Sequence, residues 1–150
     1  MNVFLDTEFT DLYNIQLISV GLVVDSGEEL YIELPYADEL CSAFVREAVL
    51  PHLYRTSECY CPRPMVRERL LDWLTAVRRP GEQIELCADD QADIDLFFDA
   101  VDYKMPPWLR AMLIGDKIDQ RLLEEFFRTA DGHRHHALYD ARANKLAFRP

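Results

Sequence analysis

The sequence predicts a single α/β domain spanning residues 1–150, with a mixed central sheet that contains an antiparallel three-strand meander and is flanked by helices. Two observations predict this class. Apolar, β-branched runs separated by short turns open the chain, and from about residue 38 helical spacing alternates with further strand-like runs. The 150 residues suit one domain, and they contain no internal repeats, low-complexity tracts or linkers.

The opening of the chain alternates in the manner of strands. The second run is rich in Ile and Val, a turn signal at residues 25–28 follows it, and Pro35 ends the third run. We therefore expect a meander of strands at residues 2–10, 16–24 and 30–34.

Helical spacing begins after this meander. Residues 38–53 predict a helix with Asp38 as its N-cap and Pro51 at its end or kink, with Phe44 among its apolar positions. A second helix is expected at residues 65–77, after a loop. A strand is expected at 84–88, then a helical segment holding Ile94 to Val101, then a short fifth strand or an irregular segment within 108–114. The next helix stops at Asp131–Gly132, and its expected buried face is Ile118, Leu122, Leu123, Phe126 and Phe127. A last helix is expected at 137–148, with Tyr139, Ala143, Leu146 and Ala147 along one side.

Composition excludes several classes of protein. No apolar stretch approaches the ~18–20 residues of a membrane span, and the chain starts directly with a strand rather than a secretion signal. We expect no membrane partner and a cytoplasmic location. Free thiols are expected at the four cysteines, because the Cys59-Tyr-Cys61 spacing does not suit a zinc hook and nothing indicates secretion; these residues are Cys41, Cys59, Cys61 and Cys87.

The net charge of −11 argues against broad electrostatic adhesion to nucleic acid. Two bound divalent ions would leave a charge of −7, which is still acidic. A nucleic-acid substrate therefore has to be short, single-stranded, or held through metal ions rather than by a basic groove.

Two acids stand near the end of the first strand. Asp6 and Glu8 share one face, because side chains alternate across a strand. Two parallel carboxylates raise each other's pKa unless a cation lies between them, and a hard divalent ion with oxygen ligands suits them. Taken alone, the pair is more typical of a solvated strand end.

Further acids and histidines follow later in the chain. Asp93 comes just past the fourth expected strand, where ligands collect in open sheets. Asp89, Asp90 and Asp95 compete with it as the middle acid of the site, and for each of these residues the alternative is a helix cap or a solvated turn. The segment 133–141 is a histidine-rich loop that enters a helix, with Asp140 in its first turns.

These motifs together resemble those of a known superfamily. Asp6-Thr7-Glu8-Phe9, a mid-chain aspartate and His135-x-Ala137-x-x-Asp140-Ala141 are similar to the three motifs of the DEDDh 3′–5′ exonucleases. The short length, the second strand Gln16-Leu17-Ile18-Ser19 and the late motif are most similar to the small polyadenylate-directed exoribonucleases called RNase AS. The resemblance spans nearly the whole chain and implies an RNase H-like exonuclease fold.

The resemblance also implies roles for individual residues. Asp6, Glu8, Asp93 and Asp140 would be the carboxylate ligands of two Mg²⁺ or Mn²⁺ ions. His135 would be the general base, because its spacing to Asp140 fits the motif, whereas His133 and His136 are expected at the surface or near phosphate. The implied reaction is hydrolysis of single-stranded RNA from its 3′ end to nucleoside monophosphates.

Candidate substrate contacts surround the first motif. Thr7, Phe9 and Thr10 could line the pocket for the terminal nucleotide, Phe9 by stacking on a base, although Phe9 is as typical of a core. The superfamily's usual Gly-rich continuation is absent, since Asp11 follows Thr10. A second candidate set could meet RNA phosphates, although a solvated helix face is the favoured interpretation: Arg63, Arg67 and Arg69.

Two other functions remain open from the sequence. One is a DNA-directed 3′–5′ exonuclease of the same superfamily, and the other is a catalytically idle nucleic-acid-binding module. A homodimer is also a hypothesis, in which the partner subunit supplies cations that the acidic monomer lacks.

Overall fold

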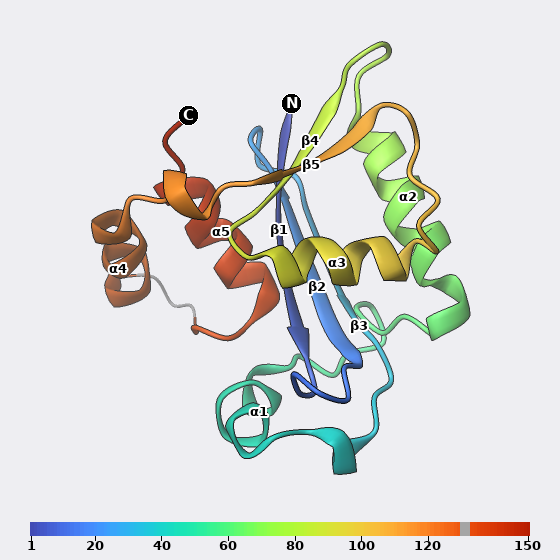
Figure 1. The fold of residues 1–150 in the computed structure, drawn as a ribbon, viewed down its shortest axis with the longest axis vertical. Helices are drawn as coiled ribbons and strands as arrows, with labels where there is room; N and C mark the ends of the chain where they lie inside the picture. The colour runs from blue at the N-terminus through green and yellow to red at the C-terminus, as the bar shows by residue number, and fades with distance from the viewer. Residues whose placement is uncertain (130–132) are drawn as a thin grey trace.

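A computed structural model describes residues 1–129 and 133–150. The five strands form one sheet in the order β3-β2-β1-β4-β5 (Figure 1). β1, β2 and β3 pair antiparallel, whereas β4 runs parallel to β1 and β5 parallel to β4. The mixed sheet with a three-strand meander is confirmed, including a short fifth strand. The strands are β1 (Asn2–Phe9), β2 (Leu17–Val24), β3 (Glu29–Glu33), β4 (Ile84–Ala88) and β5 (Leu109–Leu113).

Helices pack on both faces of this sheet. On one face, Val3 and Leu5 of β1 belong to a core with Leu70 of α2 and Phe97 of α3. On the other face, Val23 of β2 packs against α5. Figure 1 shows α3 lying across the sheet, with α2 and α4 at opposite sides of the molecule. The helices are α1 (Ala43–Ala48), α2 (Val66–Val77), α3 (Gln91–Ala100), α4 (Gln120–Thr129) and α5 (Ala137–Ala147).

Gly21 brings α5 unusually close to the sheet. A Cβ atom at this position would lie 2.3 Å from the carbonyl oxygen of Ala137, so no larger residue fits without moving the helix. Gly21 is the register partner of Asp6 in the β1–β2 ladder. The first turns of α5, which carry Asp140, therefore cross the sheet beside the acidic end of β1.

The expected helix at residues 38–53 is wrong in its extent. The segment divides into a 3₁₀ turn at 38–40, α1, and a second 3₁₀ turn at 50–52 that contains Pro51. Ser42, not Asp38, is the N-cap, because its hydroxyl accepts the Val45 N–H at 3.2 Å. Phe44, expected on a buried face, is 56% exposed.

The last two helices agree with expectation only in part. On α4 the expected face is the covered one, because its apolar residues are partly buried and every other residue of the helix is exposed, but none is fully buried. On α5, Leu146 is half-exposed, and the helix packs through small residues that permit close approach to the sheet. Its buried residues are Ala137, Leu138, Ala141, Ala143, Asn144 and Ala147. The expected stop of α4 at Asp131–Gly132 lies outside the described residues.

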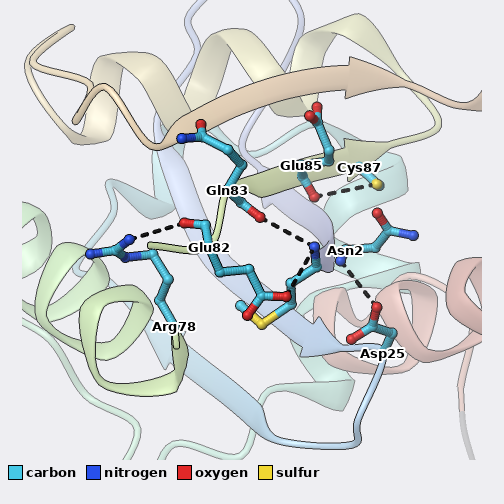
Figure 2. Close-up of polar contacts among 8 residues, drawn as sticks. Asn2, Asp25, Arg78, Glu82, Gln83, Glu85 and Cys87 are labelled. Atoms are coloured by element: carbon cyan, nitrogen blue, oxygen red, sulfur yellow. Dashed lines mark hydrogen bonds and ion pairs between the residues drawn. The ribbon is translucent and has the colours of Figure 1, made fainter. Parts of the chain in front are cut away.

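The start of β1 is tied to its neighbours at the end of the strand opposite the acids (Figure 2). The Asn2 N–H donates to Asp25 Oδ2 at 3.1 Å, and the Met1 amino group donates to the Gln83 carbonyl at 3.2 Å and lies 3.5 Å from Glu82. These contacts fix β1 between β2 and β4.

The four cysteines are buried free thiols, in agreement with the sequence analysis. Within residues 1–129 and 133–150, no helix is long and apolar enough to cross a membrane.

Candidate active site

A cleft of about 380 Å³ lies at the carboxyl end of β1. Its lining combines acids from β1, from the end of β4, from α3 and from α5, together with His135 and Arg134 from the segment before α5. The six acids are Asp6, Glu8, Asp89, Asp90, Asp93 and Asp140. The fold thus brings together all four predicted ligands and the predicted base.

Within this cleft, five of the acids form two groups that share Asp6. One oxygen from each of Asp6, Asp89 and Asp93 lies within 4.8 Å of the others, and the same holds for Asp6, Glu8 and Asp140. Carboxylate oxygens are the ligands that Mg²⁺ and Mn²⁺ prefer. The donor set therefore fits two divalent cations with Asp6 common to both.

Asp140 owes its position to the start of α5. Its Oδ2 accepts a hydrogen bond from the backbone N–H of His136 at 3.0 Å. Asp140 thus lies in the first turn of α5 and reaches back to the helix N-terminus, where an acid is favourable. This bond points Asp140 toward the face of β1 that carries Asp6 and Glu8.

Asp93 lies in the first turn of α3, as the sequence analysis expected. Its Oδ1 accepts both the backbone N–H of Thr7 at 3.0 Å and the Thr7 hydroxyl at 2.5 Å. Thr7 lines the cleft, but its donors serve Asp93. Asp90 is the N-cap of α3, because its Oδ1 accepts the Ala92 N–H, so the cap interpretation is right for Asp90. Asp95 accepts a hydrogen bond from Gln91 on the same helix.

Asp89 joins the site in addition to Asp93, rather than in place of it. It directly follows β4, and its Oδ1 accepts the Nδ2 amide of Asn144 at 2.6 Å. Asn144 is a buried polar residue of α5. Its place one turn beyond Asp140 on the same helix was a signal that the sequence carried and that the sequence analysis did not use.

The acids destabilise one another's charge. Burial, then the carboxylates of Asp93 and Asp140, raises the pKa of Asp6 well above its usual range. Burial, then Asp140 and Asp93, raises the pKa of Glu8 to about 8. Burial raises the pKa of Asp93 to about 7 and that of Asp140 to about 6, against the lowering effect of their hydrogen bonds. At neutral pH such a cluster holds protons or cations.

His135 lies exposed at the cleft with a left-handed backbone, φ 62°. Its ring meets the Phe44 ring edge-on, with the centroids 4.8 Å apart. Burial and the neighbouring Arg134 lower the pKa of His135, so the imidazole is neutral at pH 7 and can accept a proton. Strained backbone conformations of this kind collect at functional sites.

The expectation for His136 is wrong. Its ring is 2% exposed and stacks on Tyr31 at 4.5 Å and against Tyr54 at 4.7 Å, and burial lowers its pKa to about 4. The buried ring anchors the chain where the loop enters α5. His133 is exposed, as expected, and its ring stacks on His52 at 4.1 Å.

The residues expected to contact substrate differ in whether they reach the cleft. Phe9 lines the cleft and is half-exposed rather than core. Thr10 is fully buried, and its hydroxyl closes the following loop by donating to Asn14 O and accepting from Gln16 N–H, so its expected place in the pocket is wrong. Two exposed apolar residues of the cleft wall, Leu12 and Phe44, were missed because an isolated exposed side chain has no sequence signature.

The arginines before and within α2 lie elsewhere. Arg63 donates to the Leu17 carbonyl, Arg67 pairs with Asp102 at 3.8 Å, and Arg69 donates to a carbonyl of the loop before α2. These contacts agree with the favoured interpretation of a solvated, structural helix face.

Comparison with known proteins gives a fold but no close relative. No family model matches the sequence, and no curated protein matches it. Among solved structures, the nuclease domain of 3′hExo, a DEDDh family member bound to rAMP, matches with a TM-score of 0.58 and 16% identity over 99% of this chain and 94% of that chain. A full-length 3′-exonuclease matches with a TM-score of 0.61 and 14% identity over 99% of this chain and 84% of that chain.

A third similar structure is cell-death related nuclease 4 (CRN-4), with a TM-score of 0.58, 15% identity, and coverage of 96% of this chain and 60% of that chain. At such identities the likeness shows the fold. The chain has the fold of the DEDDh nuclease domains, the RNase H-like exonuclease fold that its motifs predicted.

Proposed function

We propose that this protein is a DEDDh 3′–5′ exoribonuclease that uses two divalent metal ions to hydrolyse single-stranded RNA to nucleoside monophosphates. The observation that carries the proposal is the pair of carboxylate groups sharing Asp6, with a neutral histidine at the same cleft. The fold, which is that of solved 3′-exonuclease domains, supports it.

The carboxylates would hold the metals in two sets. Asp6, Asp89 and Asp93 would hold one ion, and Asp6, Glu8 and Asp140 the other. Bound Mg²⁺ or Mn²⁺ supplies charge stabilisation for the attacking and leaving oxygens of a phosphoryl displacement. Hydrogen bonds from two other side chains would keep these ligands oriented: the Thr7 hydroxyl donates to Asp93, and the Asn144 amide donates to Asp89.

His135 takes the proton of the attacking water in this proposal. Its imidazole has to be neutral before the reaction, and its lowered pKa ensures this at pH 7. The loop position next to Asp140 lets the ring approach the scissile phosphate, while buried His136 fixes the chain immediately behind it.

The cleft suits the end of a single strand. Its volume is about 380 Å³, and half-exposed Phe9 together with Leu12 and Phe44 offers apolar surface on which an unpaired base can stack. The net charge of −11 argues against broad electrostatic adhesion to a duplex. The similarity to RNase AS motifs makes adenylate the base class to test first.

Digestion of end-labelled RNA tests the proposal. An oligoadenylate labelled at its 5′ end should give a ladder that shortens one nucleotide at a time in Mg²⁺ or Mn²⁺, with adenosine 5′-monophosphate as product. Asp140→Ala and His135→Ala should each lower the rate by at least about a hundredfold. An Asp72→Ala variant, at an exposed acid of α2 outside the cleft, is the control. Endonucleolytic fragments, or metal-bound Asp140→Ala at the wild-type rate, would refute the proposal.

The rival functions give different results in the same assay. A DNA-directed enzyme would digest a matched deoxyoligonucleotide faster, because the 2′-OH is the discriminating contact. An idle binding module would bind RNA without shortening it and would show no heat of Mn²⁺ binding in calorimetry. For the homodimer, which we retain as a proposal, gel filtration of active protein is the test, and a fully active monomer would exclude it.

A further inference from the structure

We propose that three arginines beside the cleft, Arg121, Arg128 and Arg134, bind the backbone phosphates of the RNA strand on the 5′ side of the terminal nucleotide. The inference rests on the proposed function and adds the path by which the strand leaves the metal ligands. We call these three residues the arginine surface.

A second hollow adjoins the acidic cleft. It has a volume of about 620 Å³ and is lined by Arg121, Glu124, Glu125, Phe127, Arg128 and Arg134. Phe127 and Arg134 line both this hollow and the acidic cleft. The two spaces are therefore neighbours, and an RNA strand whose 3′ end lies at the carboxylates can continue over α4.

The distribution of charge points to phosphate. The acidic cleft contains six carboxylates, and Arg134 is the only lysine or arginine among the described residues that line it. The next hollow adds Arg121 and Arg128, in a chain that has only 16 basic residues and a net charge of −11. A polyanion held by metal ions at one end meets cations first at Arg134 and then along α4.

Arg134 is held at the junction. Its guanidinium lies over the Phe127 ring, 4.4 Å from the centroid, and its Nη2 is 2.8 Å from Glu124 Oε2. Stacking on an aromatic ring orients the planar guanidinium, whose remaining N–H groups can bind phosphate oxygens in pairs. A fixed arginine of this kind suits a phosphate at one defined place in the strand.

Arg121 and Arg128 continue the line on α4. They are seven residues apart, which places them on one face at about 10 Å along the helix axis. Arg128 lies 3.9 Å from Glu125, and both side chains are mostly exposed, so this pair does not hold the arginine strongly.

Glu124 occupies the place that a phosphate would take on Arg134. Its side chain is 69% exposed, so its carboxylate can move into solvent when the strand arrives. The carboxylate competes with RNA for the guanidinium. Removing its charge should therefore strengthen RNA binding, an effect that a purely structural ion pair would not produce.

The test compares variants on a long and a short substrate. The double variant R121Q/R128Q should raise the KM for a ten-nucleotide oligoadenylate about tenfold and that for a dinucleotide less than twofold, with little change in kcat. It should also reduce the slope of log KM against log salt by about 1.4, since two phosphate contacts are lost. E124Q should lower the KM for the ten-nucleotide substrate.

The matched control is R67Q/R69Q, which removes the same charge from α2, on the opposite side of the molecule (Figure 1). If R121Q/R128Q behaves as this control does, or raises both KM values equally, the arginine surface is refuted and the exonuclease stands. If the wild-type protein digests neither substrate, the proposed function fails and the inference fails with it.

Discussion

Metal-free protein should lose stability as the pH rises, because its cleft acids are protonated only in the folded state. The pKa of Glu8 rises from 4.5 to about 8 on folding and that of Asp93 from 3.8 to about 7. A group whose folded-state pKa is raised stabilises the protein below its unfolded pKa, and that stability is lost as the pH rises through the folded value. Between pH 6.5 and pH 8.5 the free energy of unfolding should fall by about 2 kcal/mol for Glu8 and about 1 kcal/mol for Asp93.

The pH window avoids an opposing group. The pKa of His136 falls from 6.5 to about 4 through burial, so this residue destabilises the fold only as the pH drops below 6.5. Above that value the ring is mostly neutral in both states, and the acids of the cleft dominate the pH dependence.

Urea unfolding in EDTA and in Mn²⁺ measures the effect. In EDTA the stability should fall by about 3 kcal/mol between pH 6.5 and pH 8.5. In Mn²⁺ the loss should disappear or reverse, because the metal binds the ionised carboxylates of the folded state. Asp6→Asn should stabilise the metal-free protein at pH 8.5 while abolishing activity. A stability in EDTA that stays level or rises across this window would refute the reasoning.

Three further variants test how the site is held in place. Gly21→Val should displace α5, lower stability by about 1–3 kcal/mol in urea unfolding and remove activity, whereas a wild-type rate would show that the close approach is unnecessary. Asn144→Ala leaves Asp89 without its donor and should weaken Mn²⁺ binding in calorimetry by about tenfold, and unchanged affinity would exclude this orienting role. His52→Ala removes the ring that stacks on His133, two residues before His135, and should lower kcat because the loop that carries His135 is then held less firmly. His52→Phe keeps a stacked ring and should restore kcat, and an equal loss in both variants would contradict stacking as the cause.

The sequence predicts the ends of this site well because local patterns define them. Asp6 and Glu8 lie two residues apart on a strand, and that alone places both on one face. His135 and Asp140 are linked by the short distance between a loop and the first turn of a helix. For these residues, chain spacing and side-chain direction are nearly equivalent to position in space, and the fold class follows from the same local periodicities.

The middle of the site required tertiary structure. Asp89 and Asp93 appeared as rivals in the sequence, yet a strand end and the following helix turn bring both to Asp6. The donors that orient them, Thr7 and Asn144, come from distant elements. The spacing of Asn144 to Asp140 places both on one side of α5, but no spacing along the chain shows that the partner of Asn144 is Asp89.

The errors have similar causes. Residues 38–53 have helical periodicity, but the capping hydrogen bond is made by Ser42, so the α-helix begins only at Ala43, and Pro51 lies in a 3₁₀ turn after it. His136 was expected at the surface or near phosphate because its spacing to Asp140 does not fit the motif, whereas three tyrosines cover it; these are Tyr31, Tyr54 and Tyr139.

We propose that the two carboxylate groups sharing Asp6 hold two metal ions, and counting bound Mn²⁺ by electron paramagnetic resonance tests this most directly. With a nucleoside 5′-monophosphate present, the wild-type protein should bind two Mn²⁺ ions per chain. Asp140→Asn should lose mainly the ion of the group with Glu8, and Asp6→Asn should lose both. A single ion in the wild-type protein, or two ions in Asp6→Asn, would contradict the shared-ligand site.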